Sequence, residues 1–146
     1  MPYNSYKMGD KKLKYKDMLL KGTVNPDYMR YELHRVWVVD GTLKAGFSHV
    51  YGRRTFYLDE DSWTVLLEDT YGIRGDLWRV GIHGQAQYYD VPASGYRYGI
   101  IHDLDSGTYY AGGLDNEMKS VGTFEIKGRV SDYMPDAIRR LGGTTN

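Results

Sequence analysis

After about residue 30, hydrophobic and polar residues alternate with a period of two over most of the chain, which is the pattern of half-buried β-strands. Short runs rich in Gly, Asp and Asn interrupt this alternation and read as turns. The pattern predicts strands at residues 31–39, 47–58, 63–71, 76–82, 85–91, 96–103 and 108–112, and a last strand near 123–130. Because the connections between these strands are short, neighbouring strands are expected to be antiparallel.

The turn signals and the chain ends complete this picture. Turns are expected at 40–41, 59–62, 72–75, 83–84 and 105–107. Pro135 stands where a helix begins and Gly142-Gly143 where one ends, so residues 136–141 are predicted to form a short C-terminal helix. The fold class is therefore mainly β: a curved antiparallel sheet, an incomplete and open barrel-like meander, with one short helix at its C-terminal end.

Residues 1–27 differ from the rest, being polar and rich in lysine. We interpret them as an extended N-terminal arm with one short helical turn, followed by a turn at Asn25-Pro26-Asp27. Residues 28–146 are interpreted as a single antiparallel β domain, which we expect to be the C-terminal part of a longer protein.

Both faces of some predicted strands carry large apolar side chains. In residues 63–71, Trp63, Val65 and Leu67 share one face, while Leu66 lies on the other. A sheet with one face in water alternates more cleanly. The second face is therefore expected to cover something: a helix, another domain or a ligand.

Composition excludes several functions. The 19 basic and 19 acidic residues give a formal net charge of zero, so no electrostatic field attracts nucleic acid. No cysteine is present, which removes disulfides, thiolate metal sites and thiol nucleophiles. No apolar stretch approaches the roughly 20 residues of a membrane-spanning helix, and the N-terminus lacks the apolar core of a signal peptide.

Three segments in order carry a family resemblance: RYELHRVWVV, RRTFYLDEDSW and YGIRGDLWRV. Together with NSYKMGDKKLKYKDM near the start, they resemble the bacterial domain-of-unknown-function family 1329 over most of residues 3–115. The resemblance implies an exported Gram-negative protein much longer than this chain, located in the periplasm or at the outer-membrane periphery. It also implies a relationship to periplasmic lipoprotein-sorting carriers, which hold acyl chains in the hollow of an incompletely closed barrel. The family has no established catalytic residue, so none is carried over.

A binding surface is the first functional hypothesis for particular residues. The aromatic residues Trp37, Phe56, Trp63 and Trp78 are candidates to line an apolar groove, although aromatic residues also fill cores. Arg53 and Arg54 are candidates to grip the phosphate or carboxylate head of a ligand. The alternative for these arginines is cross-strand ion pairing with nearby acids such as Glu68.

Metal and catalytic motifs are weak. The run Asp59-Glu60-Asp61 lacks the spacing of a calcium loop and reads as a solvated turn. His34 and His49 lie on strands that could be neighbours, and they are the first suspects if a metal is bound. Because no HxH or HExxH pair occurs, we expect structural histidines, no metal and no cofactor. Nor does a raised pKa for an Asp59 and Asp69 acid–base pair follow from the sequence.

Three functions remain open from the sequence. The first is a non-enzymatic exported binding module that carries or chaperones a lipid-like or hydrophobic molecule. The second is a hydrolase that uses Asp, Glu or His. The third is a purely structural part of a larger outer-membrane-associated protein. Expected partners are a hydrophobic small molecule or lipid, an envelope membrane protein, or a second copy of the chain paired through an exposed sheet edge; no nucleic acid is expected.

Overall fold

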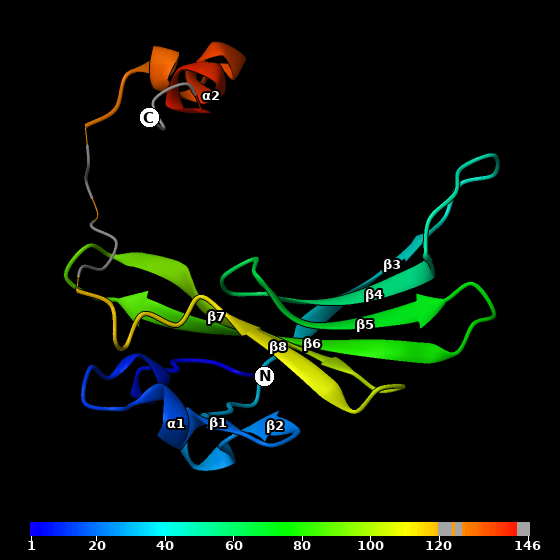
Figure 1. Ribbon diagram of the computed structural model, residues 1–146, viewed down its shortest axis with the longest axis horizontal. Coiled ribbons are helices and arrows are strands. Elements are labelled where there is room, and N and C mark those ends of the chain that lie inside the picture. Colours follow the sequence, from blue (N-terminus) through cyan, green and yellow to red (C-terminus); the bar gives the residue numbers. More distant parts are fainter. Residues whose placement is uncertain (120–123, 125–126, 143–146) are drawn as a thin grey trace.

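A six-stranded antiparallel sheet forms the body of the protein, in the strand order β3-β4-β5-β6-β7-β8. The computed structural model describes residues 1–119, 124 and 127–142. The strands are β3 (Val36–Thr42), β4 (Tyr51–Asp59), β5 (Val65–Gly72), β6 (Leu77–Tyr88), β7 (Ala93–Asp103) and β8 (Thr108–Gly112). The sheet is twisted, and β3 and β8 do not pair with each other (Figure 1). The predicted open antiparallel meander is thus confirmed.

Two of the predicted hairpin turns are confirmed, and a glycine explains each. Gly75 between β5 and β6 has φ = 88°, and Gly107 between β7 and β8 has φ = 65°. Only glycine adopts such backbone angles without steric cost. In the second turn, Asp103 also accepts hydrogen bonds from the backbone N–H and the hydroxyl of Ser106.

Other predicted boundaries were wrong. The 83–84 turn does not exist: β6 runs unbroken from Leu77 to Tyr88, with an irregular register after Gly84. Residues 40–41 lie inside β3, and the β3–β4 connection comes later, at residues 43–50. Gly84 allows the close approach of the Tyr98 ring, whereas Gly41 is an ordinary residue of the outer strand β3. Of the strand expected near 123–130, residues 123, 125 and 126 lie outside the described residues, and the described residues 124 and 127–130 are not in a strand.

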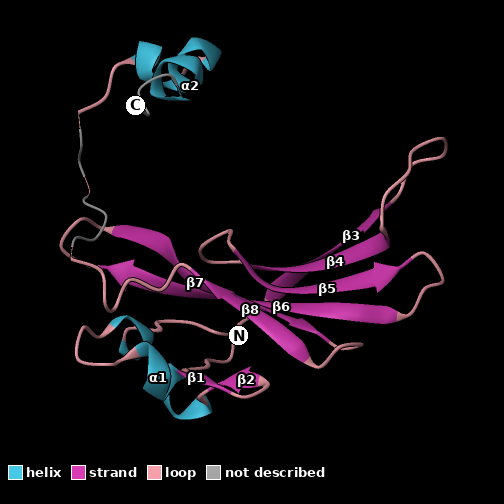
Figure 2. Ribbon diagram, viewed as in Figure 1, coloured by secondary structure: helices cyan, strands magenta, loops and turns pink. Residues whose placement is uncertain are grey.

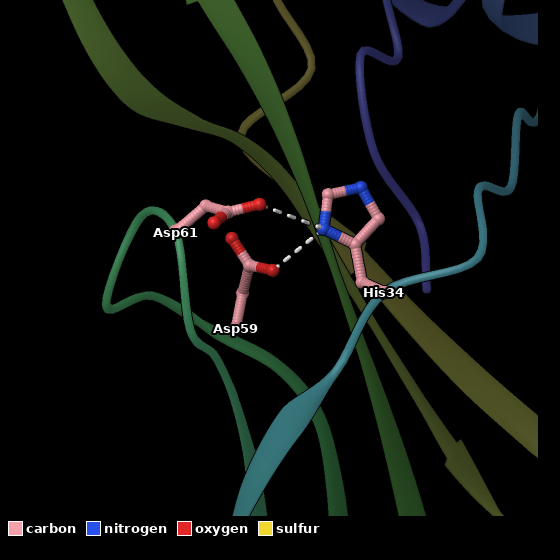
Figure 3. A group of neighbouring side chains, drawn as sticks. All are labelled: His34, Asp59 and Asp61. Atoms are coloured by element: carbon pink, nitrogen blue, oxygen red, sulfur yellow. Dashed lines mark hydrogen bonds and ion pairs between the residues drawn. The ribbon is translucent and has the colours of Figure 1, made fainter.

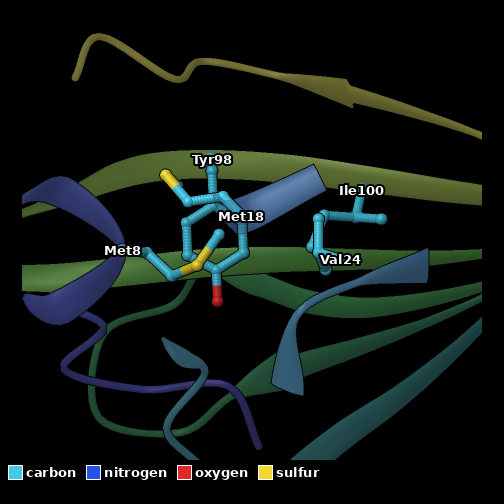
Figure 4. Close-up of a cluster of buried hydrophobic side chains, with 5 residues drawn as sticks. All are labelled: Met8, Met18, Val24, Tyr98 and Ile100. Atoms are coloured by element: carbon cyan, nitrogen blue, oxygen red, sulfur yellow. The ribbon is translucent and has the colours of Figure 1, made fainter. Parts of the chain in front are cut away.

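The N-terminal arm packs over one side of the sheet, which we call the arm face. Here α1 (Tyr15–Met18) and the small hairpin of β1 (Leu19–Leu20) and β2 (Thr23–Val24) lie beside β8 (Figure 1). Met8, Met18 and Val24 of the arm meet Tyr98 and Ile100 of β7 in a fully buried cluster (Figure 4). The main apolar core of the described chain therefore lies between the arm and the last three strands.

Tyrosine and glycine are abundant for a reason that composition did not show. A Cβ added at any of four glycines of the sheet would come to 3.0 Å or less from an atom of a tyrosine side chain. The rings cover bare backbone, as aromatic residues do when they shield glycines in sheets. The four pairs are Gly84 with Tyr98, Gly95 with Tyr88, Gly99 with Tyr96, and Gly112 with Tyr110.

The predicted C-terminal helix is confirmed as α2 (Pro135–Gly142). It stands apart from the sheet in Figure 2, and the side chain of Ile138 is 75% exposed. No helix in the described part of the chain is long and apolar enough to cross a bilayer.

Candidate functional site

The side of the sheet opposite the arm, which we call the open face, leaves apolar side chains exposed. In-register residues on adjacent antiparallel strands share a face. Gly81, Ile101 and Tyr110 pair across β6, β7 and β8, while Phe56 and Glu68 continue the same row across β4 and β5. The side chains of Ile101 and Tyr110 are 37% and 65% exposed.

A second row on the open face is charged and runs parallel to the first. Arg54 pairs with Thr70, Thr70 with Arg79, and Arg79 with Asp103. Arg79 is the centre of this row: its Nε donates to Asp103 at 2.9 Å and its Nη1 donates to the hydroxyl of Tyr51 at 2.6 Å. The guanidinium of Arg54 also lies over the Tyr51 ring, 4.7 Å from its centroid. One tyrosine therefore holds two arginines on the same face.

The carboxylates in these rows are stabilised in the charged form. Hydrogen bonds from the backbone N–H of Ser106 and from Arg79 lower the pKa of Asp103 to about 2. A hydrogen bond with His83 lowers the pKa of Glu68, although burial opposes the shift. At neutral pH both acids are ionised and partner the cations.

Three hollows join along the charged row. One of about 400 Å³ lies at the β3–β4 end and includes Arg54 and Phe56 in its lining. A second of about 170 Å³ shares Tyr51 and Arg54 with the first. The third, about 300 Å³, shares Arg79 and Ile101 with the second. We call this continuous depression across the sheet, from β3 to β8, the transverse groove.

The structure brings only some of the candidate site residues together. Trp37, Phe56 and Arg54 share the open face, because Trp37 and Val39 pair with Leu58 and Phe56. Trp78 reaches the groove region through edge-on contact with Tyr51, at 5.4 Å between ring centroids.

The other two candidates are placed differently. Arg53 borders the first hollow at the β3–β4 end, but its guanidinium stacks on Tyr71 at 3.7 Å and reaches Asp40 on the arm-face side. Trp63 is not in a strand: it lies in the β4–β5 turn with φ = 55° and is 70% exposed. Consecutive residues of a strand face opposite ways, which separates Arg53 from Arg54.

Tyr51, Ile101 and Tyr110 are groove residues that sequence reasoning did not select. Their shared position depends on strand register across the four strand pairs from β4 to β8, which no local pattern discloses. A usable signal was the recurrence of arginine on strands β4 and β6, at Arg54 and Arg79, because these strands flank a common neighbour.

A second polar cluster surrounds His34, just before β3 (Figure 3). Its Nδ1 lies 2.7 Å from Oδ1 of Asp59 and 3.7 Å from Oδ2 of Asp61. The interpretation of the 59–61 run as a solvated turn was wrong for Asp59, whose side chain is fully buried at the end of β4. Burial raises the pKa of that carboxyl, but hydrogen bonds from Ser62 and His34 outweigh it and lower the pKa below its usual value.

The suspected approach of His34 to His49 does not occur. His34 lies at the Asp59 end of the β3–β4 hairpin, where Val36 pairs with Asp59. His49 lies at the other end, where its ring contacts Tyr51. Asp59 and Asp69 are also separate, since Asp69 pairs with Thr55 and accepts a hydrogen bond from Tyr57.

The cluster contains the residue types of a hydrolytic triad but not the order that catalysis needs. A triad places histidine between the nucleophile and the acid. Here Asp59 is in the middle: it accepts from Ser62 Oγ at 2.6 Å through Oδ2 and contacts His34 through Oδ1. Ser62 therefore lacks the histidine base of a triad, and the geometry gives no support to a serine hydrolase of that kind.

Fold and site define an open antiparallel sheet with an arm over one face and an amphiphilic groove across the other. The family model described as a protein of unknown function (DUF1329) matches residues 1–139, and the chain belongs to this family. An uncharacterized protein of Pseudomonas aeruginosa is 46% identical over 142 residues. That alignment covers 97% of this chain but 31% of the relative, so the chain spans about a third of the relative's length.

Two solved structures are similar in part. One is a DUF1329 family protein from Desulfovibrio piger: TM-score 0.46, 16% identity, covering 52% of this chain and 31% of that one. The other is a Vibrio parahaemolyticus domain described, provisionally, as an outer membrane lipoprotein-sorting protein domain. It gives a TM-score of 0.49 at 13% identity and covers 92% of this chain and 59% of that one.

Proposed function

We propose that this domain is a non-enzymatic binding module of the bacterial cell envelope that holds an amphiphilic molecule in the transverse groove. The observation that carries the proposal is the groove itself. It crosses the open face from β3 to β8 and places two arginines beside exposed apolar side chains. Binding sites for small molecules are typically apolar with a few polar groups that fix orientation.

The apolar row supplies the driving force for such binding. Phe56, Ile101 and Tyr110 lie in one line, and each is partly in water. Burial of an acyl chain against them contributes about 0.8 kcal/mol per methylene removed from water. Some six methylenes laid against these three side chains would give about 5 kcal/mol, before the cost of ordering the chain and of lying near the ionised Glu68 in the same row.

Arg54 and Arg79 suit the polar end of such a ligand. Nε of Arg54 lies 3.8 Å from Glu68, an ion pair too long to be a hydrogen bond, so its donors can turn to a new acceptor. Guanidinium groups bind carboxylates and phosphates through paired N–H donors. We therefore propose a ligand with an anionic head, and envelope localisation follows from the family resemblance.

The proposal is tested with the Ile101→Glu variant and its control Val38→Glu. Both side chains are partly exposed strand residues, but Val38 lies on the opposite face from Phe56 and Ile101. The probe is a fluorescent fatty-acid analogue titrated into the purified chain. We expect saturable binding that Ile101→Glu weakens at least tenfold and Val38→Glu leaves unchanged, with both variants folded by circular dichroism. Equal affinity in the two variants, or no binding by the parent chain, would contradict the proposal.

The structural role is a second candidate, supported by β3. Trp37, Val38 and Val39 are 53%, 59% and 46% exposed, so both faces of this outer strand are in water. An outer strand with an apolar surface favours pairing with another strand. We propose that β3 pairs with a second copy or with further strands of the longer family proteins. Light scattering that shows a monomer at all concentrations would exclude the second copy.

A further inference from the structure

The imidazole of His34 has a carboxylate at each of its nitrogens. Nδ1 faces Asp59 and Asp61, while Nε2 lies 3.5 Å from Oε2 of Glu32. A neutral imidazole carries one N–H and therefore satisfies only one of these two sides. The other nitrogen would then direct a lone pair at a carboxylate. A metal ion at one nitrogen, with the proton on the other, would satisfy both sides.

The groups of this cluster are held in place before any ion arrives. The Tyr3 ring lies against the His34 ring at 4.1 Å between centroids, and the His34 side chain is only 10% exposed. Asp59 is fixed through Oδ2, which accepts from the backbone N–H of Ser62 at 2.9 Å and from its hydroxyl. Asp61 is 80% exposed and swings without disturbing the fold.

A buried amide supports this network from within the fold. Gln85 is fully buried, and its Oε1 lies 2.9 Å from Oγ of Ser62, the residue that holds Asp59. The Gln85 side chain also interacts with Tyr3, whose ring lies against His34. Asp59 and His34 are therefore both held by residues that share Gln85 as a neighbour.

We propose that His34 Nδ1, Asp59 and Asp61 bind a divalent transition-metal ion, with zinc as the best match. The donor atoms all lie within 4.8 Å of one another. Metal–ligand distances of about 2.1 Å place tetrahedral donors about 3.4 Å apart, so small side-chain shifts suffice. One nitrogen and two carboxylate oxygens suit zinc, and the net charge of −2 matches the ion.

Glu32 supplies a hydrogen-bond acceptor for His34 Nε2, on the side of the ring away from Asp59 and Asp61. When a metal occupies Nδ1, the single proton of His34 lies on Nε2 and is donated toward Glu32. A carboxylate behind a metal-bound histidine orients the ring and strengthens it as a ligand. Because Tyr3 and Glu32 come from the N-terminal segment and Asp61 from the β4–β5 turn, the ion would link these two parts. Its role would be to stabilise the fold near the arm.

The test is zinc binding to the chelator-stripped full chain, measured by calorimetry and by the shift in thermal midpoint. We expect one ion per chain, a higher midpoint, and visible absorption typical of tetrahedral cobalt(II) when cobalt replaces zinc. Asp61→Asn should weaken binding at least tenfold without loss of the metal-free fold, because this side chain is exposed. Glu60→Gln, which removes the same charge from the same turn, should leave affinity within a factor of two.

Binding should also weaken as the pH falls, because protons compete for His34. Absence of stoichiometric binding would overturn the proposal, and so would equal losses in Asp61→Asn and Glu60→Gln. The groove ligand is not involved, so this outcome is independent of the proposed function.

Discussion

A methyl group added at Gly84 is expected to destabilise the protein by about 3 kcal/mol, at the upper end of typical overpacking costs. The new Cβ would lie 2.7 Å from Cδ1 of Tyr98 and nearer still to Cε1 and Cζ, whereas real Cβ contacts essentially never fall under 3.0 Å. Tyr98 is fully buried, and its hydroxyl donates to Ser5 of the arm at 3.2 Å. The ring therefore cannot move away without disturbing the arm.

Urea denaturation of the Gly84→Ala variant measures this cost, with Gly41→Ala as the matched control. A Cβ at Gly41 meets only the Arg54 carbonyl oxygen at 3.9 Å, so we expect a change of about 0.5 kcal/mol or less there. In a Tyr98→Leu background, the Gly84→Ala cost should fall below about 1 kcal/mol, because the ring that clashes is gone. A cost that persists in that background would refute the reasoning.

Two further predictions follow from ion pairs of the described chain. The carboxyl of Asp103 has a pKa near 2 in the fold against an ordinary value of 3.8, so its stabilising contribution is complete above about pH 4 and is lost as the pH falls toward 2. Asp103→Asn should flatten the acid limb of a stability–pH curve, while the exposed Asp105→Asn should not. Arg97→Gln should cost about 2 kcal/mol, because both terminal guanidinium nitrogens donate to the carboxylate of Asp115 in a site less than a quarter exposed. Urea midpoints equal to those of the parent would contradict this.

Strand identity was readable from the sequence because alternation and turn residues act locally. The hairpins at Gly75 and Gly107 follow from backbone angles that glycine supplies. The prediction of a turn at residues 83–84 was wrong for a physical reason. Gly84 is needed for the close approach of Tyr98 from the neighbouring strand, and a glycine for contact looks identical to a glycine for turning.

Only part of the candidate site could be predicted from the sequence. Phe56 and Arg54 were selected because aromatic and arginine side chains are typical of binding surfaces, and they do share a face with the groove. The other groove residues are brought together by strand register. Tyr51 contacts both Arg54 and Arg79 only because β4, β5 and β6 pair side by side.

By itself, then, the sequence determined the class of structure, the antiparallel order of neighbouring strands, the terminal helix and the family. The first three depend on interactions between residues close in the chain, and the family depends on the order of short sequence segments. Only the tertiary structure decided which face the arm covers, that Asp59 is buried beside His34, and that a groove crosses the other face. Each of these depends on residues far apart in sequence, such as Tyr98 and Met8, whose meeting is set by the twist and register of the whole sheet.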